Sequence, residues 1–181
     1  LSVFANEVYK DCDLSRFKVS VVDDTANITE KDRMLSARMH KAITIILFKL
    51  EGQKIKKRPE FKMDDRLLLD KIDFENKRVL IGDTYHPMED CDFPTVDPAD
   101  PYKLTDDENE VINQLVDAFR HSEKLQEHIR FLYTKGGIYK TYNGNLLLHG
   151  SLPMTEDGEF LEFTIGGKVR KGKEFLVYAD R

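Results

Sequence analysis

The side chain best placed for chemistry in this sequence is His149, which follows the apolar run 146–148 and precedes Gly150. The run lies between Asn143-Gly144 and Pro153, a pattern typical of a short strand bounded by turns. A histidine at a strand end is held at the edge of a sheet, where open sheets bind ligands, and imidazole is the commonest metal ligand near neutral pH. A lone histidine in this position is, however, more often an ordinary structural residue, so the spacing leaves both interpretations open.

The other candidate groups are weaker. His121 and His128 are seven residues apart on one expected helix, which is too far for direct sharing of one metal ion. His40 is expected at the edge of the core and His86 at the surface. The acidic cluster 11–13 has no partner at metal-ligand spacing, so we expect a surface loop there.

The segment 146–153, Leu-Leu-Leu-His-Gly-Ser-Leu-Pro, resembles the fourth metal-ligand motif of the calcineurin-like metallophosphoesterases. A closer resemblance is to the class III fructose-1,6-bisphosphatases of bacteria. One departure is Ser151-Leu152, where that family often has Cys-Ile, but neither position needs to bind metal. The resemblance extends over most of the chain through the blocks 39–43, 48–51, 66–73, 121–125 and 142–150.

The resemblance implies an α+β fragment, part of an αββα metallophosphoesterase sandwich with a mostly helical insertion. It implies an enzyme that hydrolyses fructose 1,6-bisphosphate to fructose 6-phosphate and phosphate in gluconeogenesis, with two divalent metal ions, expected to be manganese. On this resemblance His149 is the metal ligand. His121, within the block His-Ser-Glu-Lys-Leu, and Asn145 and Gly150 are expected near the site.

A two-metal phosphoesterase site draws its ligands from five places in the sequence, and four of these motifs are absent here. Gly82-Asp83 is followed by Thr-Tyr-His-Pro and does not match the Gly-Asp-x-x-Asp-Arg motif. We therefore expect the central part of such an enzyme, catalytically incomplete alone. The alternative is a non-catalytic helical binding or assembly module. The presence of the first three metal motifs upstream of Leu1 would distinguish the two.

Composition narrows the class of protein. The 181 residues are 40% apolar and 34% charged, as in a globular domain with a real core. A net charge of -5 argues against a general nucleic-acid surface; the basic run 54–58 is interpreted as a helix end. Two cysteines make no disulfide framework. No apolar stretch would span a membrane and no signal peptide is found, so we expect a cytoplasmic protein. The resemblance described above implies a sugar bisphosphate as its partner.

The expected elements fall into three parts. Residues 1–31 are the end of a helix followed by a loop or linker. Residues 32–135 are a helical region with a small hairpin at Gly82-Asp83, and residues 136–181 are a truncated, β-rich part of the catalytic domain with a hairpin at Asn143-Gly144. The expected helices are 32–52, with Asp32 as its cap, 63–72, and one long helix 105–135; a further strand is expected at 160–165.

Two apolar segments, 1–8 and 175–177, are expected to lack their cover in this chain. The strand that ends at His149 is likewise expected to lack a neighbouring strand. Because exposed edges and apolar patches promote association, we expect this chain to self-associate.

Overall fold

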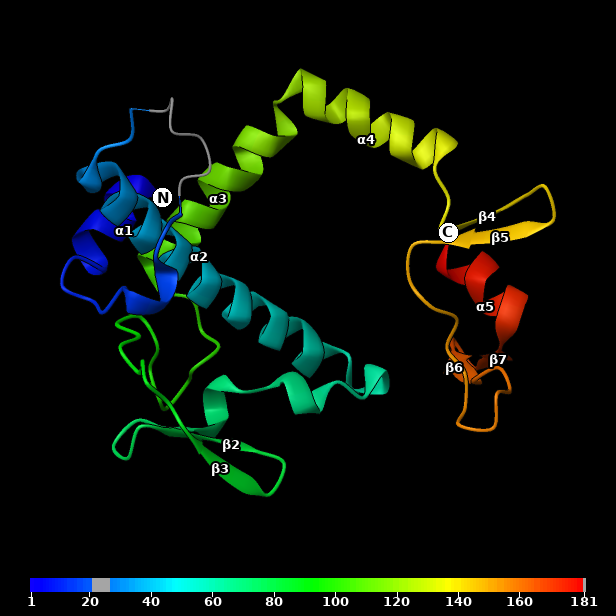
Figure 1. Ribbon diagram of the computed structural model, residues 1–181, viewed down its shortest axis with the longest axis horizontal. Helices are drawn as coiled ribbons and strands as arrows, with labels where there is room; N and C mark the ends of the chain where they lie inside the picture. Colours follow the sequence, from blue (N-terminus) through cyan, green and yellow to red (C-terminus); the bar gives the residue numbers. More distant parts are fainter. Residues whose placement is uncertain (21–26, 181) are drawn as a thin grey trace. The chain divides into compact units, whose positions relative to one another are not determined.

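The structure, a computed structural model, describes residues 1–20 and 27–180. Its contacts divide the chain into two compact units, Leu1–Asp117 and Ala118–Arg181. The helices of the first unit are α1 (Ser2–Val8), α2 (Glu30–Lys57) and most of α3 (Asp106–Arg120) (Figure 1). Its strands are β1 (Ile72–Asp73), β2 (Arg78–Ile81) and β3 (Thr84–Pro87). It also contains the short 3₁₀ turns η1 (Ser15–Phe17), η2 (Pro59–Phe61), η3 (Asp64–Arg66) and η4 (Leu69–Lys71). The predicted boundaries after residues 31 and 135 stay a prediction.

Helix α2 is longer than its periodicity predicts. It begins one residue after Thr29, whose side chain accepts a hydrogen bond from the Asp32 backbone N–H, while the Asp32 carboxylate accepts one from the Thr29 backbone N–H. This reciprocal arrangement is a capping box, so the prediction of Asp32 as the cap is wrong: it is the third helical residue. Nor does the helix end at Gly52, which is buried inside α2 with the Tyr102 ring packed where a side chain would be.

Helix α1 packs against α2. Phe4, Ala5 and Tyr9 are buried in one core cluster with Ala42, Ile45, Ile46, Val96, Leu104 and Val111. The prediction that residues 1–8 lack cover is therefore wrong for the buried side of α1, although Val3 on its other side is 68% exposed.

The predicted helix 63–72 is replaced by the turns η3 and η4, which lead into β1. Leu67 and Leu69 are both buried, in a second cluster with Ile55 and Tyr102. In a helix, two residues at this spacing would lie about 200° apart and could not share one buried side. Burial of both leucines therefore favours turns over a helix.

The strands β1, β2 and β3 form a three-stranded antiparallel sheet. The predicted hairpin at Gly82-Asp83 is confirmed, with Ile81 paired to Thr84 and Leu80 to Tyr85. His86 lies on β3 and is exposed, as predicted.

The predicted helix 105–135 is interrupted. Helix α3 ends at Arg120, and α4 (Glu123–Lys135) begins after Ser122, whose hydroxyl oxygen accepts a hydrogen bond from the Leu125 backbone N–H. Apolar residues recur at spacings of three and four on both sides of the break, and this spacing alone predicted one helix. At the other end, Thr105 and Glu108 form the capping box that the sequence Thr-Asp-Asp-Glu predicts.

The second unit contains two hairpins and a terminal helix. Strands β4 (Tyr139–Tyr142) and β5 (Asn145–Leu148) pair antiparallel, and β6 (Phe163–Ile165) pairs with β7 (Lys168–Arg170) ahead of α5 (Gly172–Ala179) (Figure 1). Asn143 and Gly144 have φ angles of 49° and 74°, the left-handed backbone that favours Asn-Gly. The strand predicted at 160–165 is shorter, because Phe160 forms only an isolated bridge with Met154.

Burial in the second unit differs from expectation in two places. Leu146 and Leu147 are 49% and 51% exposed, so β5 is not the buried strand that its composition indicates. Within residues 1–20 and 27–180, β5 pairs with β4 alone. The segment 175–177 is better covered than predicted, because Leu176 is buried and the Phe175 ring stacks on Phe163 at 4.5 Å. The αββα sandwich would involve further strands and stays a prediction.

Candidate functional site

His149 lies in a bend directly after β5, and its side chain is exposed. The hairpin fixes its place: the Asn-Gly turn sets the register, in which Tyr139 pairs with Leu148 next to the histidine. A Cβ atom added to Gly150 would meet no atom within 4 Å, so the space at Gly150 is open. The imidazole thus lies directly after a strand and is accessible from outside.

The residues predicted near His149 are spread over the second unit. Asn145 begins β5 at the opposite end of the strand, about 13 Å away at ~3.3 Å per residue, and its side-chain amide donates to the Asn143 carbonyl oxygen within the turn. His121 lies at the break between α3 and α4. Gly150 alone adjoins the histidine.

The part of the chain that the structure describes offers an incomplete donor set for a metal ion. Within the described residues, no group of three or more His, Cys, Asp or Glu side chains could hold a metal ion. One exposed imidazole binds a divalent ion far too weakly to build a two-metal centre. His149 therefore fits one position of such a centre, and the remaining donors would come from outside these residues.

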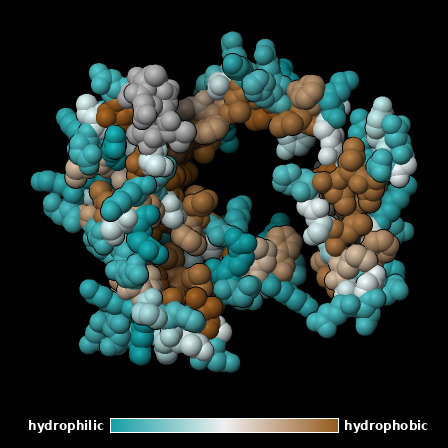
Figure 2. Space-filling model, in the orientation of Figure 1, coloured by the Kyte–Doolittle hydropathy of each residue, from teal (hydrophilic) through white to brown (hydrophobic). Residues whose placement is uncertain are grey.

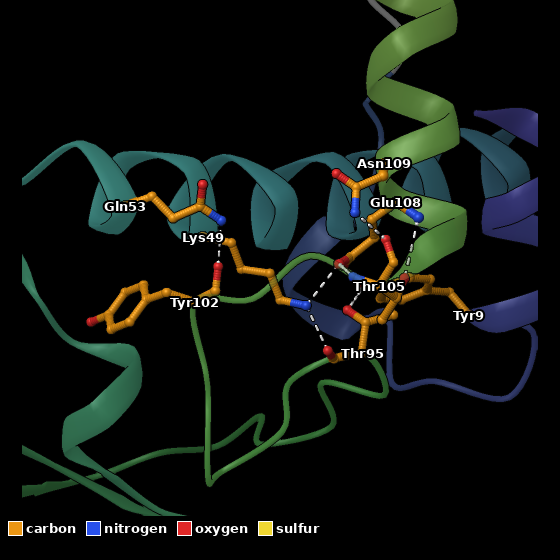
Figure 3. A network of polar contacts seen from close by, with 8 residues as sticks. All are labelled: Tyr9, Lys49, Gln53, Thr95, Tyr102, Thr105, Glu108 and Asn109. Carbon is orange, nitrogen blue, oxygen red and sulfur yellow. Dashed lines mark hydrogen bonds and ion pairs between the residues drawn. The ribbon is translucent and has the colours of Figure 1, made fainter. Parts of the chain in front are cut away.

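The first unit contains a buried polar network that the sequence analysis missed (Figure 3). The Lys49 ammonium donates to Glu108 Oε2 at 2.8 Å and to the Thr95 carbonyl oxygen at 2.6 Å, and both charged side chains are 0% exposed. The Tyr9 hydroxyl lies 3.1 Å from Thr95 Oγ1. The network joins α1, α2, the loop before α3 and the start of α3. A lysine inside the apolar stripe of α2 is the signal that could have revealed it.

Lys41, two turns before Lys49, makes a second internal ion pair. Its ammonium donates to the Asp13 carbonyl oxygen and to both carboxylate oxygens of Asp90, at 2.8–3.0 Å. The pair brings the two Asp-Cys-Asp segments of the chain, 11–13 and 90–92, beside each other. Burial raises the pKa of the Cys12 thiol to about 11, so little reactive thiolate forms near neutral pH. This cluster is structural.

A hollow of about 430 Å³ in the first unit is lined mainly by apolar side chains of α2, the 3₁₀ turns and the β1–β3 sheet. None of the residues predicted to carry chemistry lines it. The two acidic residues on its wall, Glu89 and Asp90, are already paired with Arg16 and Lys41. It therefore presents no free charge for catalysis.

Comparison with known proteins identifies the class of this chain. The family described as firmicute fructose-1,6-bisphosphatase matches residues 1–181, and the chain belongs to this family. It is 48% identical over 180 residues to the class 3 fructose-1,6-bisphosphatase of Clostridium novyi (strain NT), covering 99% of this chain and 27% of that protein. The class 3 fructose-1,6-bisphosphatase of Clostridioides difficile (strain 630) is 48% identical over 176 residues, which cover 97% of this chain and 26% of that relative.

The class 3 fructose-1,6-bisphosphatase of Clostridium botulinum (strain Langeland / NCTC 10281 / Type F) is 45% identical over all of this chain and 27% of its own length. The chain thus spans about a quarter of the length of these relatives. No solved structure matches it significantly. Among the helices that the structure describes, none is long and apolar enough to cross a membrane. The family resemblance predicted from the blocks around His149 is confirmed.

Proposed function

We propose that this chain is a portion of a class 3 fructose-1,6-bisphosphatase, an enzyme that hydrolyses fructose 1,6-bisphosphate to fructose 6-phosphate and phosphate in gluconeogenesis in the cytoplasm. The observation that carries the proposal is the family match over every residue, together with 45–48% identity to relatives that bear this name. The described residues contain no complete donor set for metal, and the proposed activity belongs to the longer protein.

Within that enzyme we propose His149 as one ligand of a two-metal centre that holds manganese. Such a centre, when loaded, supplies a metal-activated hydroxide and neutralises charge on the transferred phosphoryl group. The contribution of this chain is position: the β4–β5 hairpin holds the imidazole at the end of β5, and Gly150 leaves open space beside it. The free edges of the hairpin allow further strands to join it, as the proposed αββα sandwich requires.

The test is His149→Ala in the full-length protein. Loss of one ligand misplaces the reacting groups, and a misplacement of about 1 Å costs on the order of 100-fold in rate, so turnover should fall at least that much. Because the ring is exposed, the melting temperature should hardly change. Excess manganese should restore part of the activity by mass action.

His121→Ala is the matched control, since His121 lies in the same unit but at the break between α3 and α4. It should cause at most a moderate loss of turnover that manganese does not rescue. Near-normal turnover of His149→Ala at ordinary metal concentration would show that His149 is a structural residue and not a ligand.

A further inference from the structure

A second hollow, of about 420 Å³, lies within the second unit between β7 and α5. The β6–β7 hairpin runs directly into α5 there (Figure 1). Four cationic residues occur within the six positions 168–173, although the whole chain has a net charge of -5. The hollow is lined by Lys168, Val169, Arg170, Lys173, Glu174, Val177 and Tyr178.

The charges on this lining do not cancel. Three cations and the Glu174 carboxylate leave two net positive charges on the wall. The fourth cation of the run, Lys171, is occupied by an ion pair with Glu162 at 2.9 Å. Within the described part of the chain, no ion pair engages Lys168 or Lys173, and both side chains are exposed. The hollow therefore has positive charge available for an anionic ligand.

Arg170 is held in place on this wall. Its Nη1 donates to the carbonyl oxygens of Ile165 and Lys168, and its guanidinium carbon lies 4.1 Å from the centre of the Tyr178 ring. Those contacts leave Nε and Nη2 for a ligand in a fixed orientation. A guanidinium fixed in this way presents the paired donors that match two oxygens of a phosphate group.

We propose that this hollow binds the phosphate of a sugar phosphate monoester. A phosphate monoester carries roughly -1.5 to -2 charge near neutral pH, which matches the net charge of the lining. The aliphatic side chains of Val169 and Val177 and the Tyr178 ring offer an apolar wall for the sugar carbons. The hollow also falls within the usual volume range of small-ligand sites, about 300–1,000 Å³.

The proposal rests on the proposed function in one respect. A bisphosphate substrate has two phosphate groups, and only one of them is transferred to water. The second group needs a cationic site of its own, and the β7–α5 hollow lies in the same unit as His149. We assign it to the phosphate that is not cleaved.

The test is titration of the metal-free 181-residue chain with four compounds, followed by calorimetry and by amide chemical shifts. Fructose 6-phosphate and fructose 1,6-bisphosphate should bind and shift the amides of residues 163–178. Inorganic phosphate should bind more weakly, and fructose should not bind. Equal affinity for inorganic phosphate and fructose 6-phosphate would overturn the assignment to a sugar phosphate.

Variants locate the site. Lys168→Gln and Lys173→Gln should each weaken fructose 6-phosphate binding about tenfold, the loss expected for one charge-assisted hydrogen bond. Arg170→Lys, which keeps the charge and removes the paired donors, should weaken it similarly. Lys135→Gln on α4 is the matched control and should have no effect. Unchanged affinity in Lys168→Gln and Lys173→Gln, with both variants folded, would overturn the proposal.

These results are independent of the test of His149. The hollow could bind the sugar phosphate while the full-length form fails to hydrolyse the bisphosphate. That result would refute only the proposed function. If the full-length form hydrolyses the bisphosphate, and Lys168→Gln and Lys173→Gln bind fructose 6-phosphate with unchanged affinity, only the assignment of the hollow as the phosphate site is refuted.

Discussion

At the scale of single residues, the stability of the first unit depends on the buried lysines of α2. Lys49 and Glu108 are both fully buried, and Glu108 Oε1 has no hydrogen-bond partner among the described residues. Removal of one member of a buried pair leaves the other charged and unsolvated, so Lys49→Met should lower the free energy of unfolding by about 3–5 kcal/mol. Urea denaturation measures this.

The double variant Lys49→Met/Glu108→Leu is the informative companion, because an apolar pair of similar volume often replaces a buried ion pair with little loss. It should recover most of the lost stability. Lys54→Met, at an exposed position of the same helix, is the control and should change little. A loss no larger than that of Lys54→Met would mean that the ion pair contributes nothing to the fold.

Two buried tyrosines predict an alkaline transition. Burial raises the pKa of Tyr102 to about 12, helped by the charge of Asp70, and burial also raises the pKa of Tyr9. A raised pKa means that folding favours the protonated phenol. The resulting stability is complete below the ordinary tyrosine pKa of about 10 and is lost as the pH rises through the folded value.

Melting temperature should therefore fall between pH 10 and pH 12, while tyrosinate absorbance should show phenols that titrate above the ordinary tyrosine pKa of about 10. Tyr102→Phe should reduce the alkaline fall, because one late phenol is removed. A melting temperature that stays flat over this range would contradict the assignment.

At the scale of elements, helix propensity and packing favour different residues at position 52: propensity favours alanine, and packing favours the native Gly52. Alanine at this helix position should stabilise α2 by about 1 kcal/mol on propensity alone. A Cβ there would lie 2.1 Å from a ring carbon of Tyr102, whose hydroxyl is fixed by Asp70 and whose ring faces the Lys56 ammonium. We expect the clash to prevail and Gly52→Ala to destabilise by about 1–3 kcal/mol.

The sign of this effect can be reversed in a second background. When Tyr102→Ala has removed the ring, adding Gly52→Ala should become stabilising. Thermal or urea unfolding of the native protein, the two single variants and the double variant measures the sign of the Gly52→Ala effect in each background. A stabilising Gly52→Ala in the native background would show that the ring moves aside at little cost.

The elements that sequence reasoning predicted are those with a local cause. Both hairpins were placed correctly because Gly82-Asp83 and Asn143-Gly144 carry their own backbone preference, and the Thr105–Glu108 capping box closes within four residues. The failures had distant causes. Gly52 is buried in α2 against the ring of Tyr102, which is distant in sequence, and the turns at 63–72 pack into a core with Ile55.

For the candidate site, too, what was predictable depended on residues close in sequence. The position of His149 at a strand end was predictable from the residues on either side of it. Its metal partners were not, because no complete donor set lies within the described residues. The basic β7–α5 hollow was missed although four cationic residues lie close together at 168–173, because the sequence does not show that β7 and α5 fold around one hollow.

At the scale of the whole molecule, the two units differ in how much they bury. The first contains both core clusters and both internal ion pairs. Among the described residues of the second, Leu176 alone is buried, while Phe131, Leu132 and Tyr133 of α4 are at least 63% exposed. Figure 2 shows the hydrophobic colour along one side of α4. Self-association through such surfaces stays a prediction.

This difference predicts an uneven pattern of hydrogen exchange. Amides exchange through local opening, and segments with few buried contacts open at little free-energy cost. In the 181-residue chain, amides in the middle of α2 should be the most protected, whereas those of α4 and the β4–β5 hairpin should exchange several orders of magnitude faster. Mass spectrometry of peptides from each unit measures both rates in one sample. In the full-length protein the α4 and hairpin amides should become protected, because the proposed catalytic domain would cover them. Equal protection of both units in the 181-residue chain would show that the second unit is stable without further cover.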